Sequence, residues 1–328
     1  MENYLFLGID VSKLTLDACC IQSGLVMTLS NDKKGFESLF KALSKQNKAQ
    51  QPLWLVFENT GIYSQNLANY CTKMEIRFSQ VSGLEILRSQ GISRSKTDKV
   101  DARKICKYAM EKASSLKHDA PTNTRLMKMK SLLSLRDKLV IQSSGLKKTA
   151  KELQVVLGLN TADIQVQSQI KIANTIDIQI KKISLELKQL LNEDEELKRT
   201  MSLLLSIKGV GEIIAYYTIV YTKNFTAFEN SRKFSCYCGT APFPYTSGTS
   251  VRGKTKVNHL ANKKLKSLLE LGARSAITCD PEIKHYYKRR LELGKNKTST
   301  LNIVRNKLIG RMFAVVKNQR PYEIKLAA

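Results

Sequence analysis

The feature of this sequence that most limits its fold is Leu53–Glu58 (Leu-Trp-Leu-Val-Phe-Glu), a run that is apolar until it ends on a carboxylate. A continuously apolar run of this length is typical of a strand buried on both faces in the centre of a parallel sheet. Parallel strands need crossover connections, which are usually helices that cover the sheet. The run therefore predicts an α/β domain in which Glu58 lies at the end of a central strand.

The neighbouring segments have the order that such a domain requires. Three short strand-like runs open the chain without a helix between them, and helical and strand-like runs alternate afterwards. We expect strands at Tyr4–Asp10, Leu14–Gln22, Leu25–Ser30, Leu53–Glu58 and Ile76–Val81, and helices at Lys34–Gln46, Tyr63–Met74 and Thr97–Lys112. A meander followed by this alternation predicts an RNase H-like α/β domain over residues 1–118.

Residues 119–197 carry no strand signal and predict two long polar helices, Leu126–Leu153 and Ile170–Leu191. Within the second, apolar residues step by 4, 3, 4 and 3, which is a short heptad seam. The seam is formed by Ile176, Ile180, Ile183, Leu187 and Leu190. It predicts an antiparallel coiled coil within the chain, a contact between two chains, or a helix packed on its own domain.

Residues 198–328 predict a mainly helical third domain. Leu203–Thr222 contains Ile-Lys-Gly-Val-Gly at 207–211 between two helical patterns, which resembles a helix-hairpin-helix whose backbone N–H groups contact a phosphate. An ordinary glycine helix cap explains the same residues. Pro242–Gly253 reads as a loop, and three basic helices are expected after it, at Ala261–Ile277, Ile283–Leu293 and Thr298–Lys317.

Charge indicates a polyanionic partner. The net charge is +26, and from Val251 to Ala328 there are 19 Lys/Arg against 5 Asp/Glu, a net +14. Lys and Arg that neutralise phosphates release counterions, which favours binding of DNA or RNA; a solvated basic surface is the alternative. No apolar run approaches a membrane span, and the start of the chain does not resemble a signal peptide. We expect a cytoplasmic protein that associates with the nucleoid when it binds DNA.

The cysteines predict no zinc site. Cys236 and Cys238 are too closely spaced for a zinc knuckle, and the chain has only three histidines. All seven cysteines are expected to be reduced and buried, including Cys71, Cys106 and Cys279 in apolar helical patterns.

Four carboxylates form the candidate catalytic set. Asp10 and Glu58 end predicted strands, and Asp98 and Asp101 share one face of a predicted helix because they are three residues apart. Carboxylates held together repel one another unless a cation lies between them, and oxygen ligands suit Mg²⁺ or Mn²⁺. Two such ions could serve phosphoryl transfer. Singly, a turn cap or a helix-dipole contact explains each aspartate equally well.

The motifs around these acids resemble those of a known family. Gly-Ile-Asp at 8–10, Phe-Glu-Asn-Thr-Gly at 57–61, Lys-Thr-Asp-Lys-Val-Asp-Ala-Arg at 96–103 and Tyr-Thr-Ser-Gly-Thr-Ser-Val-Arg-Gly at 245–253 are similar to those of the DEDD insertion-sequence transposases and recombinases, which include the Piv-type invertases. The resemblance spans nearly the whole chain. It departs from the family pattern at Gly239-Thr240, where Gly-Leu is usual, and at Ala261-Asn262, where Gly-Asn is usual.

This resemblance implies a RuvC-like first domain in which Asp10, Glu58, Asp98 and Asp101 bind Mg²⁺, and a C-terminal transposase domain in which Ser247 attacks DNA to form a phosphoserine link. Ser250 is the rival nucleophile in the same segment. Arg252 and Lys254 would lie near the phosphate or on a solvated loop. The implied partners are donor and target DNA, a guide RNA of the element (a bridge RNA) in some members, and further copies of the chain, as a dimer that joins into a tetramer on DNA.

Two other functions fit the same residues. A RuvC-like nuclease would use the acids with water as the nucleophile, and would leave Ser247 as a turn residue. A noncatalytic nucleic-acid-binding protein would use the charge alone. A Rossmann-like nucleotide enzyme lacks support, because no G-x-G-x-x-G or G-x-x-x-x-G-K-[ST] motif follows a strand.

Overall fold

The protein is described by a computed structural model that covers residues 4–47, 49–89, 98–119, 123–247, 251–258 and 260–323; for residues 245–247, 251, 252 and 254 it describes the backbone only. The chain divides into two compact units, Met1–Asn123 and Thr124–Ala328. The division into three domains, 1–118, 119–197 and 198–328, stays a prediction. Within the described ranges, no helix is both long and apolar enough to cross a bilayer.

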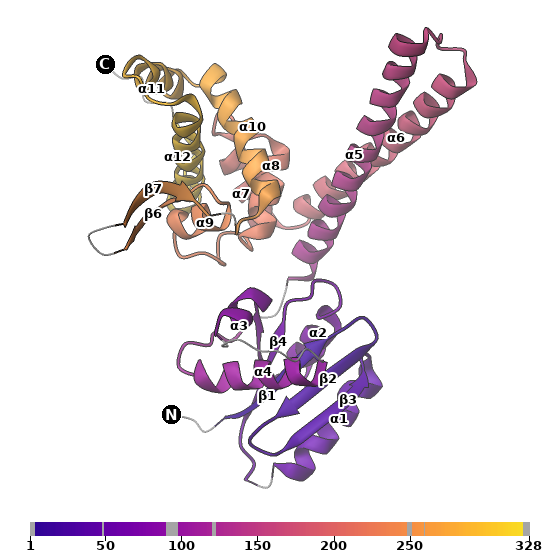
Figure 1. The fold of residues 1–328 in the computed structure, drawn as a ribbon, viewed down its shortest axis with the longest axis vertical. Helices are drawn as coiled ribbons and strands as arrows, with labels where there is room; N and C mark the ends of the chain where they lie inside the picture. The colour runs from indigo at the N-terminus through magenta and orange to yellow at the C-terminus, as the bar shows by residue number, and fades with distance from the viewer. Residues whose placement is uncertain are drawn as a thin grey trace. The chain divides into compact units, whose positions relative to one another are not determined.

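A five-stranded mixed sheet forms the centre of the first unit (Figure 1). In sheet order its strands are β3 (Leu25–Ser30), β2 (Thr15–Cys20), β1 (Leu5–Val11), β4 (Leu53–Glu58) and β5 (Arg77–Val81). β2 is antiparallel to β1 and β3, whereas β1, β4 and β5 are parallel. The meander is therefore confirmed, Leu53–Glu58 is an interior strand between β1 and β5, and the mixed sheet fits an RNase H-like domain.

Helices cover both faces of this sheet. The face bearing Leu7, Ile9 and Phe57 forms one core with α1 (Lys33–Gln46) and α2 (Gln65–Lys73). The face bearing Phe6, Trp54 and Val56 forms a second core with α3 (Gly83–Ser89) and α4 (Asp98–Glu111). Because neighbouring residues of a strand point to opposite faces, β1 presents Phe6, Gly8 and Asp10 to the second face. The sequence did not predict the short α3, and Thr97, the expected start of α4, lies outside the described residues.

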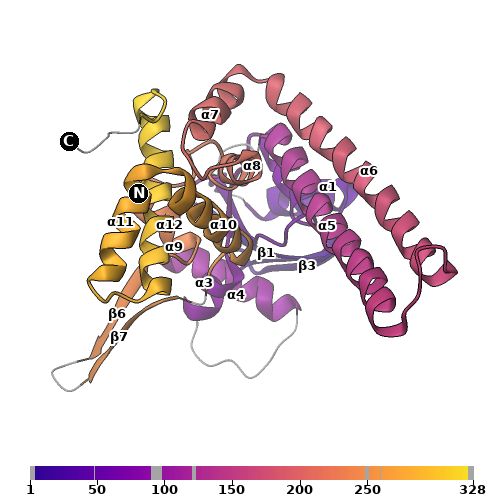
Figure 2. The same ribbon diagram turned by 90° about the horizontal axis from the view of Figure 1, so that it is seen from above.

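The second unit begins with an antiparallel pair of long helices, α5 (Thr124–Leu157) and α6 (Ile164–Asn192), which lie side by side in Figures 1 and 2. Ile183, Leu187 and Leu190 of the predicted seam are buried, in a core that includes residues of α5. These three residues are thus covered within the chain, which fits both an antiparallel pair and a helix packed on its own domain, whereas Ile176 and Ile180 are half-buried.

The rest of this unit is a helical body. Its helices are α7 (Glu195–Leu205), α8 (Glu212–Tyr221), α9 (Ser231–Tyr237), α10 (Lys263–Cys279), α11 (Pro281–Glu292) and α12 (Lys297–Asn318). The three basic C-terminal helices are confirmed. Buried Asp280 ends α10 and caps α11, where its Oδ1 accepts from the Ile283 N–H, and its Oδ2 accepts from Arg311 at 2.6 Å.

The prediction that Pro242–Gly253 is a loop is wrong. β6 (Pro242–Ser247) and β7 (Val251–Val257) pair antiparallel as a two-stranded ribbon, which extends from the helical body in Figures 1 and 2. Its prolines and glycine hid the strand signal. The ladder is irregular between Phe243 and Tyr245, where Pro244 has no N–H to donate.

The cysteine prediction holds in part. All seven are free thiols, and Cys19, Cys20, Cys71, Cys106 and Cys238 are buried. Cys236 is half-buried, and Cys279 is exposed, as is Thr278 beside it.

Candidate active site

Two of the four predicted acids lie at neighbouring strand ends. Ile9 of β1 is paired in parallel with Phe57 of β4, so Asp10 and Glu58 follow side by side at the carboxyl ends of adjacent strands. Both side chains are half-buried. In open α/β sheets, this edge is where ligands usually bind.

The other two acids reach the same edge because α4 packs on β1 without a side chain between them. A Cβ on Gly8 would lie 2.2 Å from the Cys106 nitrogen and 2.4 Å from the Ala102 oxygen. The Cys106 thiol also donates to the Phe6 carbonyl at 3.3 Å. Since α4 passes Phe6 at Cys106 and Gly8 at Ala102, its first turn, with Asp98 and Asp101, lies toward Asp10.

The pKa of Asp10 reflects both its burial and the negative charges near it. The pKa of Asp10 is raised from its ordinary value of 3.8 to about 6, first by burial and then by the negative charges of Asp98, Asp101, Glu58 and Asp17. Asp10 therefore lies among negative charges, and a bound cation would relieve their repulsion.

The donor set fits a hard divalent cation, because carboxylate oxygens are the ligands that Mg²⁺ and Mn²⁺ prefer. Asp101 is also paired with Lys104, whose Nζ is 2.7 Å from Oδ1. Within the described parts of the chain, no three or more His, Cys, Asp or Glu side chains are gathered closely enough to hold a metal ion. The acids are therefore neighbours around Asp10 and not a closed ligand shell.

Sequence reasoning missed a fifth carboxylate. Asp17 of β2 is paired directly with Asp10 of β1, so the two side chains share a face of the sheet. Asp17 is 7% exposed, and its Oδ1 accepts from the Thr28 hydroxyl at 2.6 Å. The available signal was an acid inside the otherwise apolar run Leu16–Cys20, which lies opposite the end of the first strand once the meander is folded.

The predicted nucleophile lies in the second unit. Ser247 is the last residue of β6 and is paired with Val251 of β7. Its side chain, those of Arg252 and Lys254, and all of Ser250 are outside what the structure describes. Because Ser247 ends β6 and pairs with the first residue of β7, its backbone lies at the end of the ribbon away from the helical body.

The turn between α7 and α8 carries the predicted helix-hairpin-helix glycines. Gly209 has φ +93°, and a Cβ there would lie 2.5 Å from the Gly272 oxygen on α10. Gly211 precedes α8 as its N-cap and has no atom within 4 Å of an added Cβ. Gly209 is thus explained by packing and backbone conformation, whereas Gly211 lies at an open helix N-terminus.

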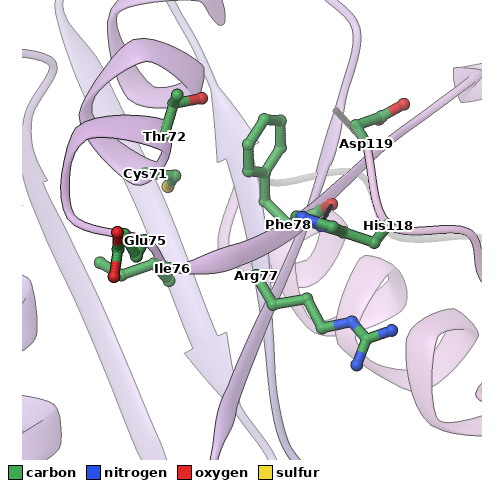
Figure 3. A pocket seen from close by; sticks show the side chains of 8 residues that line it. All are labelled: Cys71, Thr72, Glu75, Ile76, Arg77, Phe78, His118 and Asp119. Atoms are coloured by element: carbon green, nitrogen blue, oxygen red, sulfur yellow. Dashed lines mark hydrogen bonds between the residues drawn. The ribbon is translucent and has the colours of Figure 1, made fainter. Parts of the chain in front are cut away.

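A cavity of about 460 Å³ lies elsewhere in the first unit (Figure 3). It is lined by Cys71, Thr72, Glu75, Ile76, Arg77, Phe78, His118 and Asp119. None of the candidate acids lines it, and Arg77 and Phe78 point to opposite sides of β5. Buried Cys71 has its pKa raised to about 12 by burial, so it is no nucleophile at neutral pH.

Two family models match the chain. A model described as the transposase IS116/IS110/IS902 family matches residues 201–288, and a DEDD transposase model of the IS110 type matches residues 7–157. The chain belongs to the IS110-type transposases and recombinases. As a member of this family, it is a DNA-recombining enzyme. The DEDD match includes all four predicted acids, and the other match includes Ser247 and the α7–α8 turn.

Two relatives of this IS110-type enzyme match nearly its whole length, and a third matches about half of it. It is 27% identical over 327 residues, 98% of each chain, to the pilin gene-inverting protein of Moraxella bovis, and equally to that of Moraxella lacunata. An uncharacterized 43.6 kDa protein of insertion element IS110 from Streptomyces coelicolor is 29% identical over 174 residues, which are 53% of this chain and 42% of that protein.

Proposed function

We propose that this enzyme cuts and rejoins DNA through a covalent serine–phosphate link, with Ser247 as nucleophile and with Asp10, Glu58, Asp98 and Asp101 as ligands of Mg²⁺ or Mn²⁺. The observation that carries the proposal is the approach of acids from three separate stretches of chain to the end of β1, where burial first and then their negative charges raise the pKa of Asp10 to about 6. A purely structural role does not explain why a strongly basic protein keeps its carboxylates together against their repulsion.

A metal held by these acids would supply the activation that a serine nucleophile needs. A serine hydroxyl is weakly nucleophilic at neutral pH and needs activation. When bound, the divalent cation supplies Lewis-acid stabilisation of charge on the phosphoryl oxygens. In the proposed step Ser247 Oγ forms a bond to phosphorus, one scissile P–O bond breaks, and the released DNA hydroxyl takes up the proton that Oγ loses.

The phosphoserine conserves the energy of the cut bond. A DNA hydroxyl from the second partner can then attack the phosphorus and release Oγ, so that strands are rejoined without ATP. The chemistry requires Ser247 and the carboxylates to meet at one phosphate, from one chain or from two copies. The two substrates would be donor and target DNA, in keeping with relatives named for inverting a gene segment.

A guide RNA and a dimer that joins into a tetramer on DNA belong to the same proposal. The net charge of +26 suits RNA as well as DNA. Sequencing the nucleic acid that co-purifies with the protein would test the RNA: a discrete RNA species of the element is expected, and DNA fragments alone would remove it.

The serine is tested by trapping the link. End-labelled DNA containing the element's ends is incubated with full-length protein and Mg²⁺, and protein–DNA adducts are separated under denaturing conditions. We expect an adduct with wild type and with Ser250→Ala, and none with Ser247→Ala. Its persistence in Ser247→Ala would remove this serine from the role. Cleavage without an adduct in wild type would support a nuclease that uses water.

The acids are tested by Asp98→Asn. This change removes one charge and keeps the size of the side chain, so we expect Mg²⁺-dependent cleavage to fall by at least about 100-fold while DNA binding stays within about two-fold. Full activity of Asp98→Asn would contradict the metal assignment for this residue.

A further inference from the structure

The pairing of β6 with β7 does not set the direction in which the ribbon extends. Among the described residues, its two strands hydrogen-bond as a sheet only to each other, and Phe243 is 42% exposed although it is apolar. A two-stranded hairpin alone is marginally stable in water. The direction in which the ribbon presents Ser247 must therefore be set at its root, the segment Cys238–Pro242.

Two asparagines of α12 hold this root. Asn302 Nδ2 donates to the Thr240 carbonyl at 2.7 Å, and Asn306 Nδ2 donates to the same oxygen at 2.9 Å. In return, the Thr240 hydroxyl is 3.0 Å from Asn306 Oδ1 and donates to it. Thr240 is fully buried. We call this set of three residues the root clamp.

The root clamp fully satisfies the hydrogen-bonding capacity of the Thr240 carbonyl. A carbonyl oxygen has two lone pairs, and the two asparagine amides occupy both on Thr240. Because the site is buried, a clamp residue that lost its partner would leave a desolvated polar group unpaired. The root therefore has one strongly preferred position on α12.

A second anchor acts just beyond the clamp. Arg232 of α9 donates to the Pro242 carbonyl at 3.1 Å, and its guanidinium lies 5.7 Å from the centre of the Phe243 ring. On the inner side, a Cβ on Gly239 would lie 2.3 Å from Ala261 Cβ, so the root also packs closely against the segment that follows β7. These contacts fix the first residues of β6 from both sides.

A small rotation at the root displaces Ser247 by a large distance. Ser247 is seven residues beyond Thr240, which at about 3.3 Å per residue is roughly 23 Å of strand. A rotation of about 5° at the root therefore moves the serine by about 2 Å. A misplacement of about 1 Å at a reacting centre can cost about 100-fold in rate.

We propose that Asn302, Asn306 and Thr240 are positioning residues for the serine nucleophile: they aim the ribbon, and through it Ser247, at the scissile phosphate. This proposal rests on the proposed function, since it gives the ribbon a reacting atom to place.

The test compares variants of the full-length protein by three readouts: melting temperature, DNA affinity, and the single-turnover rate of Ser247–DNA adduct formation. Asn306→Asp keeps the shape of the side chain and loses both N–H donors. Thr240→Val loses only the hydroxyl, and Thr240→Ser keeps it. Asn318→Ala, at an exposed position in the last turn of α12, is the matched control.

We expect Asn306→Asp to bind DNA within about two-fold of wild type and to form the adduct about 10- to 100-fold more slowly. Thr240→Val should be slower than Thr240→Ser, which should remain near wild type, as should Asn318→Ala. A clamp that only stabilises the fold would lower the melting temperature and leave the rate of the folded protein unchanged.

A wild-type rate in folded Asn306→Asp, with an adduct that still depends on Ser247, would overturn the clamp and leave the proposed function standing. An adduct that persists in Ser247→Ala would instead overturn the proposed function. If Asn306→Asp does not fold, Asn302→Ala decides the question, because it removes one donor and leaves the Thr240–Asn306 pair in place; a wild-type rate there overturns the clamp.

Discussion

Gly8 and Asp10 lie two residues apart on the same face of β1. In the proposed site, the spacing of the acids around Asp10 depends on Gly8. Gly8 has no side chain, so the backbone of α4 packs directly on the strand at Ala102 and Cys106. That close approach brings the first turn of α4 to Asp10. After burial, the negative charges of Asp98 and Asp101 are the next largest causes that raise the pKa of Asp10. The glycine in Gly-Ile-Asp therefore sets the spacing of the acids as well as the packing of the domain.

Replacing Gly8 by alanine should move α4 away from β1. An added Cβ would overlap backbone atoms that cannot yield separately, so we expect a destabilisation of about 1–3 kcal/mol and a loss of Mg²⁺-dependent cleavage. Denaturant unfolding and the adduct assay measure the two effects. Gly145→Ala is the control: it is exposed within α5 with no atom near an added Cβ, and should stabilise by about 0.5–1 kcal/mol. A Gly8→Ala protein as stable and active as wild type would refute the role of this packing.

The raised pKa of Asp10 predicts how Mg²⁺ and pH act together. The unfolded chain releases this proton near the ordinary value of 3.8, and the folded chain near 6. Between these values the folded state binds more protons, so Asp10 lowers stability as pH rises through this window. A cation competes with the proton for the carboxylate. Mg²⁺ should therefore raise the melting temperature more at pH 7.5 than at pH 5, and an equal rise at both would contradict a metal site at Asp10.

Individual residues could be predicted where they carry a local pattern. Asp10 and Glu58 follow apolar strands, and Asp98 and Asp101 have helical spacing. Asp17 has only a weak local signal, an acid inside an apolar run, because its place opposite Asp10 depends on the register of β1 with β2. The root clamp joins residues more than 60 positions apart through single hydrogen bonds, and no spacing in the sequence reveals such a contact.

At the scale of elements, the two glycines of the α7–α8 turn have different explanations: Gly209 is required by the packing and backbone of the turn, whereas Gly211 lies at an open helix N-terminus. Gly209 needs a positive φ and contacts α10, so Gly209→Ala should cost about 2–4 kcal/mol from backbone strain and overpacking together. Gly211→Ser should leave stability unchanged or raise it, because serine is a preferred N-cap and Gly211 has an extended backbone. Thermal denaturation of both variants checks this, and equal losses would show that the turn does not have this structure.

Elements were predictable in proportion to the length of their pattern. The apolar β4, the meander, the α5–α6 pair and the three basic helices have long or strongly periodic signals. The helices α3 and α9 have seven residues each and were missed, since two turns give too few positions to establish a period. The β6–β7 ribbon was read as a loop because Pro242, Pro244 and Gly253 interrupt the alternation that marks a strand.

At the scale of the whole molecule, the net charge of +26 predicts strongly salt-dependent DNA binding. Lys284 and Lys288 lie one turn apart and exposed on α11. If both contact phosphates, their joint change to glutamine should reduce the slope of log K against log salt concentration by about 2. Lys33→Gln on the exposed side of α1 should leave the slope unchanged. Fluorescence anisotropy over a range of salt measures it, and an unaltered slope in the double variant would exclude α11 from the DNA-binding surface.

The proposed mechanism divides between the two units: it requires the first unit to bind a divalent cation and the second to supply the serine. Titration of Mn²⁺ into the full-length protein, followed by the loss of the free-ion electron paramagnetic resonance signal, measures this directly. We predict that Asp10→Asn weakens Mn²⁺ binding at least about ten-fold, while Glu37→Gln, an exposed acid on α1, binds as wild type does. Equal binding by wild type and Asp10→Asn would contradict the account.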